Sequence, residues 1–445
     1  MTRTDANHHW TRDGPQTSVI CIGFPFRLFI TAFFRLTITL VLFPAWMGAW
    51  RGVAAQSETP VTPGVEVLVD AFAARLEGKR VAILTNPSGV DRAMVSTIDR
   101  VRELPRINVI RLFAPEHGLR GGLAAGEMVK GGKDPVSGLP VVSLHGASRR
   151  PSRDDLKDLD IVLYDIQDVG HRTYTFVSSL TYLMEACEEA GVAVWVLDRP
   201  EPMGGKHFGG PMLDKANVSF IGVHDVPQVY GMTPGEWARL IQRERTPRLE
   251  LSVVPMRGWR RGMTYGELGW VWVPPSEHIP RWESSFFYAM TGTLGELGVV
   301  SEGVGTPLPF EQIGAPWIDA RQLARALNRP ALDGVKFRPT TFRPRYGAYQ
   351  DKTCFGVQIH LTHPKTCQPY RVSDLILTTL ARDYAGRELF KPGSNDRYRM
   401  FLKAVGDGMF ANALSSDDGF ETYRGRARAR LEDYARRRQA VLIYE

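Results

Sequence analysis

Polar loops follow five apolar runs of this sequence, and they hold most of the residue types that carry out acid–base chemistry. The loops are Asn86–Gly89, Pro115–Gly118, His145–Gly146, Gln167–Arg172 and Asp198–Pro202. One such loop would be an ordinary polar turn. Five of them at the carboxyl ends of parallel strands predict a functional cleft, because ligands bind at that edge of an open sheet.

Glu116 is the carboxyl group with the best placement for general acid catalysis. It lies between a proline and the pair His117-Gly118, so a tight turn would hold its side chain over the strand edge. Loss of solvent there could raise the pKa of the carboxyl group. The alternative is that Glu116 caps the next turn. Asp165 and Asp168 end a very apolar run and are further candidates, although Asp168 could equally cap the following helix.

Two arginines in these loops could hold a substrate carboxylate, because a guanidinium group donates two parallel hydrogen bonds to such a group. They are Arg172 and Arg199. Arg172 is the better candidate, since Asp198 could form an internal ion pair with its neighbour Arg199. Each histidine of the loops could be a ligand-binding or a structural residue.

The connection 265–316 adds aromatic side chains and one more carboxyl group. Trp270, Trp272 and Trp282 lie in it. Flat aromatic rings beside a polar cleft suit sugar rings, whose C–H faces are apolar, but tryptophans in an interdomain core are an equal alternative. Glu302 precedes a Gly-rich turn and could reach the cleft from a second domain.

The sequence lacks the spacings of several common sites. It has no C-x-x-C pair and no H-E-x-x-H motif, so no metal site is expected. It has no G-x-G-x-x-G after a strand and no G-x-x-x-x-G-K-[ST], which disfavours nucleotide cofactors. We therefore expect no cofactor. The absence of G-x-S-x-G makes a serine esterase or amidase a weak alternative.

The elements that must position these loops form a pattern of alternating strands and helices. Strands are expected at 81–85, 108–114, 141–144, 161–166 and 193–198, and the clearest helix at 174–190. Strands that are apolar on both faces and separated by helices predict a parallel sheet with helical cover. A helix at 233–244 and a strand at 249–256 extend it.

Beyond residue 315 the pattern changes to a helix at 320–327, two strands at 335–342 and 354–361, and helices at 372–384, 398–405 and 426–438. The predicted fold class is therefore α/β. A Rossmann-like parallel-sheet domain spans 64–314, a smaller C-terminal α+β domain spans 315–445, and the active cleft lies between them. Cys354 and Cys367 could pair in an oxidising compartment.

The first 55 residues predict export. An apolar run at 24–50 is followed by small residues, as in a cleaved signal peptide, and 56–63 reads as a linker. The alternative for 1–55 is an uncleaved membrane segment, which would be the protein's only contact with a membrane. In both cases we expect the folded body to be periplasmic or secreted. The net charge of +7 over 445 residues is a weak argument for a nucleic-acid partner, so none is expected.

Seven stretches carry a family resemblance: LFAPEHGLRG (112–121), LYDIQDVGHRTYTF (163–176), VLDRPEPMGG (196–205), SFIG (219–222), GMTPGEWA (231–238), WVPPSEHIP (272–280) and SEGVGTPLPFEQIGAPW (301–317). From about Gly64 to its end the sequence resembles the exo-β-N-acetylmuramidases of glycoside hydrolase family 171, long catalogued as a domain of unknown function. The sequence departs from the family pattern at Glu201, 229–230, 277–278 and 295–299, which leaves the exact sugar open.

The resemblance implies an enzyme that removes terminal N-acetylmuramic acid from the non-reducing end of peptidoglycan fragments, with amino sugars or muropeptides as its ligands. Glu116 is expected to be the general acid, with Asp165, Asp168 or Glu236 as the second carboxylate. Alternatively the acetamido group of the substrate assists, and no protein nucleophile exists. The expected substrate-binding residues are Asn86, His117, Gln167, Arg172, Tyr174, Asp198, Arg199 and Glu302. Arg172 is expected to hold the lactyl carboxylate. The rival function is a non-catalytic binder of cell-wall sugars.

Overall fold

The computed structural model describes residues 60–121, 131–146, 148–393, 396–415 and 419–445. The expected signal peptide, residues 1–55, lies outside these ranges. Among the described residues, the helices are all too short or too polar to span a bilayer.

The larger sheet has seven strands in the order β3-β4-β2-β1-β5-β6-β9. All neighbouring pairs are parallel except β3 and β4, which are antiparallel. This sheet confirms the predicted α/β fold. Its strands are β1 (Arg80–Thr85), β2 (Asn108–Ala114), β3 (Gly132–Lys133), β4 (Pro140–Ser143), β5 (Ile161–Asp165), β6 (Ala193–Leu197) and β9 (Leu251–Val254).

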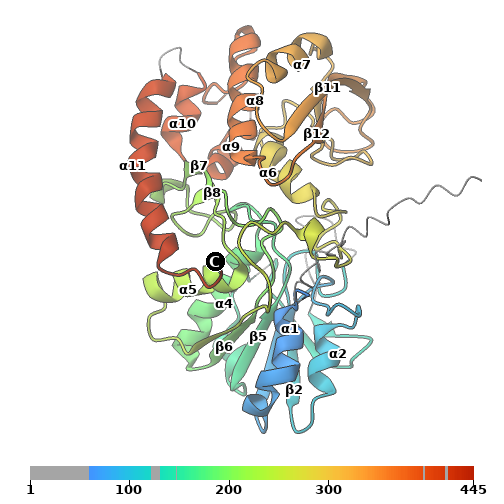
Figure 1. Ribbon diagram of the computed structural model, residues 1–445, viewed down its shortest axis with the longest axis vertical. Coiled ribbons are helices and arrows are strands. Elements are labelled where there is room, and N and C mark those ends of the chain that lie inside the picture. The colour runs from blue at the N-terminus through green and yellow to red at the C-terminus, as the bar shows by residue number, and fades with distance from the viewer. Residues whose placement is uncertain (1–59, 122–130, 147, 394–395, 416–418) are drawn as a thin grey trace, which may run out of the picture. The chain divides into compact units, whose positions relative to one another are not determined.

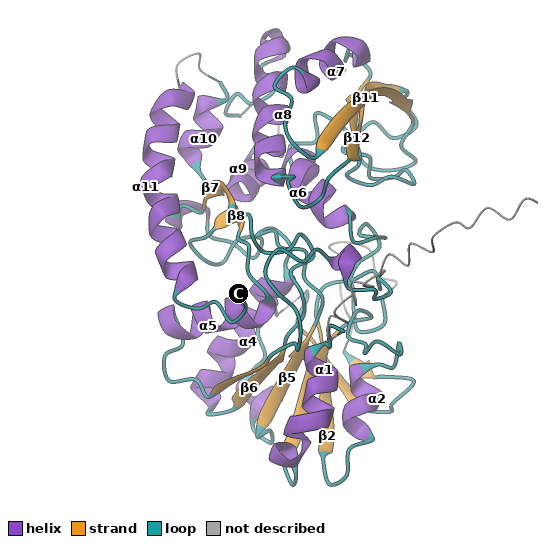
Figure 2. Ribbon diagram, viewed as in Figure 1, coloured by secondary structure: helices purple, strands orange, loops and turns teal. Residues whose placement is uncertain are grey.

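Helices cover both faces of this sheet (Figure 2). On one face, Ile83 and its neighbours pack against α1 (Gly64–Val67) and α2 (Thr97–Arg102). On the other face, Leu84 and its neighbours pack against α4 (Phe176–Ala190) and α5 (Pro234–Glu244). Successive side chains of a strand point to opposite faces, so both sets of residues are buried and the strands read as continuous apolar runs. The short helix α3 (Arg153–Leu156) precedes β5.

A smaller lobe is built around a three-stranded antiparallel sheet in the order β10-β12-β11. Its strands are β10 (Gln312–Ala315), β11 (Val335–Phe342) and β12 (Cys354–Leu361), and its helices are α6 (Ser284–Gly295), α7 (Ala320–Asn328), α8 (Pro369–Asp383), α9 (Tyr398–Val405), α10 (Gly408–Ala413) and α11 (Gly419–Gln439). The antiparallel pair β7 (Gly209–Met212) and β8 (Pro227–Val229) lies between this lobe and the large sheet (Figure 1).

The smaller lobe begins earlier than the expected boundary at 315. Helix α6 packs against α8, and β10 pairs with β12, although both α6 and β10 precede that residue. The chain therefore changes lobe before residue 284. The last residues return to the large sheet, where the C-terminus lies beside α5 (Figure 1). Cys354 and Cys367 are both buried and unpaired, so the possible disulfide is not formed.

Candidate active site

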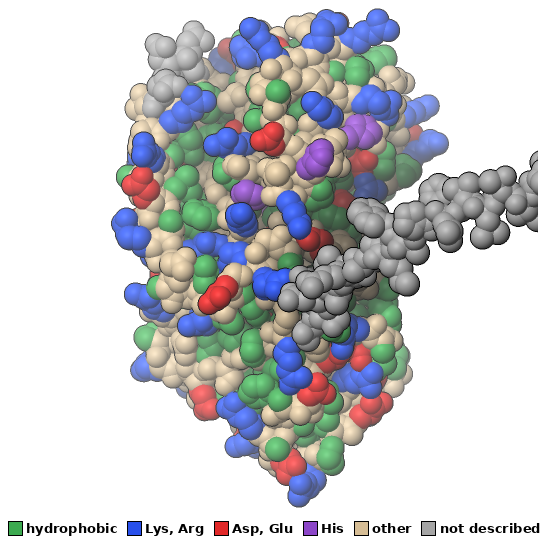
Figure 3. All heavy atoms as spheres, viewed as in Figure 1, with side chains coloured by type: hydrophobic (Ala, Val, Ile, Leu, Met, Phe, Trp, Pro, Cys, Tyr) green, Lys and Arg blue, Asp and Glu red, His purple; other side chains and the backbone are tan. Residues whose placement is uncertain are grey.

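The parallel order of the strands brings the polar loops together. Strands β4, β2, β1, β5 and β6 are consecutive neighbours in the sheet, so the five loops leave it at the same edge. Figure 2 shows that these loops and the connections to the smaller lobe fill the space above the strands. On the face shown in Figure 3, Lys and Arg side chains are spread among acidic and other residues and do not gather in one patch.

A cavity of about 300 Å³ opens at this edge. Glu116 follows β2, His145 follows β4, and Thr175 directly precedes α4. The connection between β7 and β8 contributes Phe220, and α9 of the smaller lobe contributes Lys403. The cavity therefore lies where elements of both lobes meet, as the predicted cleft requires.

A tight turn holds Glu116 at this cavity. The Gly118 N–H donates to the Pro115 carbonyl oxygen at 3.0 Å, and His117 has a positive φ of 67°. A positive φ is uncommon for a residue other than glycine and is often found at functional sites. His117 thus shapes the turn that presents its neighbour.

The Glu116 carboxyl group is oriented by its neighbours. Thr175 Oγ1 donates to Glu116 Oε2 at 2.6 Å, and His145 Nε2 lies 3.8 Å from Oε1. The side chain of Glu116 is 14% exposed, so it reaches the cavity without being surrounded by water. This arrangement fixes one carboxyl oxygen by a hydrogen bond and is suited to proton transfer at a ligand.

Glu296 is a second carboxyl group near Glu116 that was not predicted. It caps the C-terminus of α6, and its Oε2 lies 3.8 Å from Arg397 Nη2. Burial raises the pKa of Glu296, the positive charge of Arg397 opposes this, and the negative charge of Glu116 raises the pKa further. The two carboxyl groups therefore interact across the lobes. Glu296 lies within 295–299, where the sequence departs from the family pattern.

Glu302 lies beside Glu296. A methyl group added at Gly295 would approach the Glu302 Cδ to 2.7 Å, so Glu302 packs under the end of α6. Burial raises the pKa of Glu302 to about 7, and the charge of Glu296 adds to this effect. Glu302 belongs to the smaller lobe and does not line the cavity that contains Glu116, so its predicted contact with the substrate stays a prediction.

Asp165 and Arg199 form a buried ion pair. Arg199 Nη2 donates to Asp165 Oδ2 at 2.9 Å, Arg199 Nε donates to Oδ1, and Thr97 also donates to Asp165. The predicted ion pair between Asp198 and Arg199 is wrong, because the guanidinium group of Arg199 pairs with Asp165. Asp165 and Arg199 have almost no exposed surface, so their ion pair braces the ends of β5 and β6.

Asp198 and Glu236 hold the C-terminal tail. Asp198 accepts hydrogen bonds from Tyr444 Oη at 2.6 Å and Thr233 Oγ1 at 2.8 Å, and burial raises its pKa to about 7. Glu236 forms a capping box with Thr233, pairs with Arg261, and accepts from the Ile443 N–H at 2.9 Å. Glu236 is fully buried and engaged in these contacts, which disfavours its predicted catalytic role.

Asp168 and Gln167 are buried below the loops. Asp168 Oδ1 accepts from the Gly170 N–H at 2.8 Å and from Tyr230 Oη, so Asp168 closes a local turn and does not cap the helix. Burial raises the pKa of Asp168 to about 6, and among the described residues its Oδ2 has no partner. Gln167 Nε2 donates to the Pro200 carbonyl oxygen at 2.9 Å.

Arg172 is a structural tether. Its Nη1 donates to the carbonyl oxygens of Pro211 at 2.9 Å and Val226 at 2.8 Å, and its Nη2 donates to those of Ala404 at 3.0 Å and Val405 at 2.8 Å. The side chain is fully buried. Arg172 therefore joins the segments around β7 and β8 to α9, which disfavours the prediction that it holds a substrate carboxylate.

Asn86 and Tyr174 brace the loops against the segment 272–280. Asn86 Nδ2 donates to the Pro275 carbonyl oxygen at 3.1 Å, and its Oδ1 accepts from Ser88 Oγ at 2.6 Å. Tyr174 Oη donates to Ser276 Oγ at 2.9 Å. Both side chains are buried, so they hold the loops in place and do not line the cavity.

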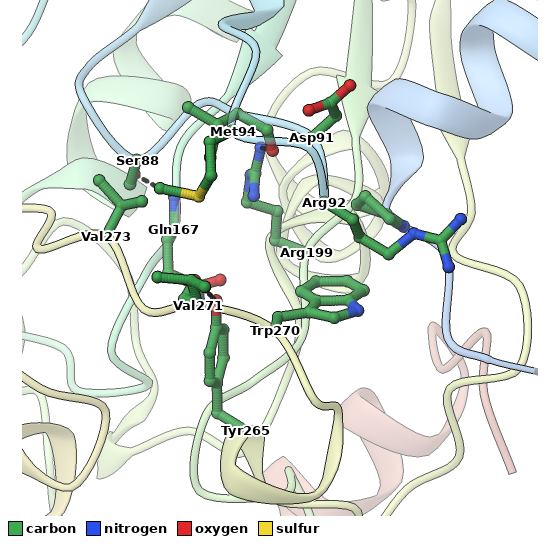
Figure 4. Close-up of a pocket in the computed structure, with 12 residues that line it drawn as sticks. Ser88, Asp91, Arg92, Met94, Gln167, Arg199, Tyr265, Trp270, Val271 and Val273 are labelled. Carbon is green, nitrogen blue, oxygen red and sulfur yellow. Dashed lines mark hydrogen bonds between the residues drawn. The ribbon is translucent and has the colours of Figure 1, made fainter.

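The predicted tryptophans serve packing. Trp270 Nε1 donates to the Val61 carbonyl oxygen at 3.1 Å, and Trp272 Nε1 donates to that of Ile279 at 3.0 Å. Trp270 also lines a second cavity with Gln167 and Arg199 (Figure 4), but its volume of about 20 Å³ holds about one water molecule. Phe220 is the aromatic side chain that lines the cavity of about 300 Å³ at Glu116.

Within the described ranges, no three His, Cys, Asp or Glu side chains are grouped so that they could hold a metal ion. The polar side chains that line the cavity at Glu116 carry carboxyl, imidazole, hydroxyl and basic groups.

Comparison with known proteins covers almost the whole described chain. The family model described as the N-terminal part of exo-beta-N-acetylmuramidase NamZ matches residues 81–283, and the model of the C-terminal part matches 286–444. The two models meet at the start of α6, where the chain changes lobe. A curated relative, peptidoglycan beta-N-acetylmuramidase NamZ of Bacillus subtilis (strain 168), is 35% identical over 416 residues, covering 92% of this chain and 99% of the relative.

Two crystal structures of DUF1343 family proteins from Bacteroides fragilis NCTC 9343 have the same fold. One has a TM-score of 0.81 at 37% identity, and the other has 0.67 at 26% identity. Each match covers 87% of this chain and 99% of the other chain.

Proposed function

This chain belongs to the exo-β-N-acetylmuramidase NamZ family of glycoside hydrolases, and on that premise we propose that it removes terminal N-acetylmuramic acid from the non-reducing end of peptidoglycan fragments. The observation that carries this proposal is the position of Glu116 in the cavity of about 300 Å³. That volume is at the lower end of small-molecule sites, and it suits one sugar residue better than a long glycan.

Glu116 acts as the general acid in this proposal. The Thr175 hydroxyl group fixes Oε2, so Oε1 carries the proton to the glycosidic oxygen of the leaving group. The bond from that oxygen to the anomeric carbon then breaks, and the leaving sugar departs as a neutral alcohol. Charge develops on the anomeric carbon and its ring oxygen, as in other glycosidases.

The second group of the reaction is Glu296 or the acetamido group of the substrate. Glu296 comes from the opposite lobe, and the charge of Glu116 helps to raise its pKa, so Glu296 is the candidate for a second carboxyl group from the protein. If the acetamido oxygen attacks the anomeric carbon, Glu296 instead orients the acetamide. In both routes water finally supplies the hydroxyl group of the released N-acetylmuramic acid.

End specificity tests this proposal. The purified protein is incubated with two sets of short peptidoglycan glycans, one with N-acetylmuramic acid and one with N-acetylglucosamine at the non-reducing end, and products are identified by mass spectrometry. We expect single N-acetylmuramic acid residues from the first set only. Saturable binding of the first set without any released sugar would favour the rival function, a non-catalytic binder.

We also propose that the protein acts outside the cytoplasm, in the periplasm or after secretion. The support is the apolar run at 24–50 with the small residues that follow it. Cell fractionation and N-terminal sequencing of the mature protein test this proposal. We expect a mature chain that begins near residue 56, and a cytoplasmic chain that begins at Met1 would contradict it.

A further inference from the structure

We propose that Arg149 and Lys403 together bind the lactyl carboxylate of N-acetylmuramic acid and so select this sugar over N-acetylglucosamine. The inference rests on the proposed function. It replaces the role that the sequence assigned to Arg172, whose N–H groups at Nη1 and Nη2 are engaged by backbone carbonyls.

Both basic side chains line the cavity that contains Glu116. Arg149 lies in the loop after β4, four residues after His145. Lys403 lies on α9, where Met400 precedes it by three residues, so both side chains are on one face of the helix and both reach the cavity. The two basic side chains therefore come from different lobes and line the same cavity.

Phe220 positions the guanidinium group of Arg149. The Arg149 Cζ lies 4.3 Å from the centre of the Phe220 ring, and this ring also packs against His145 at 6.3 Å. A cation over an aromatic face is stabilised electrostatically and loses freedom of movement. Because His145 Nε2 lies 3.8 Å from Glu116, this packing connects the charged group to the reacting carboxyl group.

Within the part of the chain that the structure describes, the two positive charges at the cavity have no acidic ion-pair partner. Arginines and lysines elsewhere in the two lobes have carboxylate partners, as Arg150 has Glu189 at 2.6 Å and Lys391 has Glu388 at 2.9 Å. For Arg149 and Lys403, no Asp or Glu of the described ranges lies within ion-pair distance. Two uncompensated cations at one cavity complement an anionic ligand.

The chemistry of the proposed substrate supplies that anion. N-acetylmuramic acid differs from N-acetylglucosamine by a lactyl ether that carries one carboxylate. A guanidinium group binds both oxygens of a carboxylate in one plane, and an ammonium group adds a mobile point charge. Since the lactyl group is attached to the sugar ring, binding it also places the anomeric carbon relative to Glu116.

The test compares N-acetylmuramic acid with its methyl ester, which keeps the shape of the lactyl group and removes its charge. Inhibition constants of both are measured against hydrolysis of 4-nitrophenyl β-N-acetylmuraminide, in the wild type and in Arg149→Gln and Lys403→Gln. We expect each variant to weaken the acid roughly tenfold to a hundredfold and to leave the ester unchanged. Lys403→Arg should recover part of the loss.

Arg150→Gln and Lys391→Gln are the matched controls, since each removes a basic side chain of the same kind from the same lobe outside the cavity. They should leave both inhibition constants unchanged. Equal weakening of acid and ester, or no weakening of either, would overturn the inference. If the wild type hydrolyses no muraminide but binds the acid more tightly than the ester in titration calorimetry, the proposed function is overturned instead, because charge recognition would stand without catalysis.

Discussion

At the scale of single residues, hydrogen-bond partners separate the ligand-facing side chains from the structural ones. Glu116 borders the cavity and accepts a hydrogen bond from Thr175 Oγ1, whereas Glu236 accepts hydrogen bonds from its helix cap and from the C-terminal tail. The spacing of Thr233 and Glu236 already has the form of a capping box. That signal could have identified Glu236 as structural from the sequence.

Other residue roles could not be read from the sequence. Arg172 donates to backbone carbonyls 232 and 233 residues further along the chain. A carbonyl oxygen has no sequence signature, because every residue carries one. Likewise the pairing of Arg199 with Asp165 in place of Asp198 depends on the register of β1, β5 and β6 and on the direction in which each side chain leaves its strand.

Glu296 gives the first prediction. Glu296→Gln should lower kcat on 4-nitrophenyl β-N-acetylmuraminide by at least about a hundredfold, because both proposed routes use its carboxylate close to the reacting centre. KM should change little. Glu283→Gln is the control, since Glu283 lies at the opposite end of the same helix. Equal kinetics of the two variants would exclude Glu296 from the reaction.

At the scale of elements, the sequence pattern was enough to predict most strands of the large sheet and two strands of the smaller lobe, but β3, β7, β8, β10 and helix α6 were not predicted. The expected bounds of β2, β11 and β12 match the structure, because each has a run of β-forming residues between turns. Helix α6, whose residues are SSFFYAMTGTLG, was missed. It is buried on most sides and lacks the one-sided apolar pattern by which a surface helix is recognised. The smaller lobe therefore begins before the predicted boundary at residue 315.

Arg172 gives a prediction for how these elements are joined. Arg172→Met should lower the free energy of unfolding by about 3 kcal/mol or more, because four buried carbonyl groups around β7, β8 and α9 lose their donor. Denaturant unfolding measures the change. Arg102→Met, an exposed arginine on α2, should stay within about 0.5 kcal/mol of the wild type. A loss no larger than in this control would contradict the tether.

At the scale of the whole described molecule, the chain crosses between its lobes twice. It enters the smaller lobe at α6, and after α11 its tail returns to the large sheet, where Ile443 and Tyr444 contact Glu236 and Asp198. The active cavity takes residues from both lobes, so its geometry depends on this closure. The sequence predicted two domains and a cleft but gave no sign of the returning tail.

Removal of residues 443–445 tests this closure. We expect the deletion to lower the melting temperature by several degrees, because the buried Tyr444 side chain and its hydrogen bond to Asp198 are lost. Calorimetry should then resolve separate transitions for the two lobes. Tyr444→Phe, which loses only the hydroxyl group, should show a smaller decrease. An unchanged single transition in the deletion variant would mean that the tail does not join the lobes.

The central claim is that Glu116 delivers the proton that cleaves a terminal N-acetylmuramic acid, and Glu116→Gln tests it most directly. The variant keeps the shape of the side chain and its contact with Thr175 but has no acidic proton. We expect kcat on a disaccharide of N-acetylmuramic acid and N-acetylglucosamine to fall by about 10²–10⁴-fold, while the affinity for N-acetylmuramic acid is retained. Glu103→Gln, an exposed carboxyl group beyond α2, is the control. Turnover by Glu116→Gln near that of this control would contradict the account.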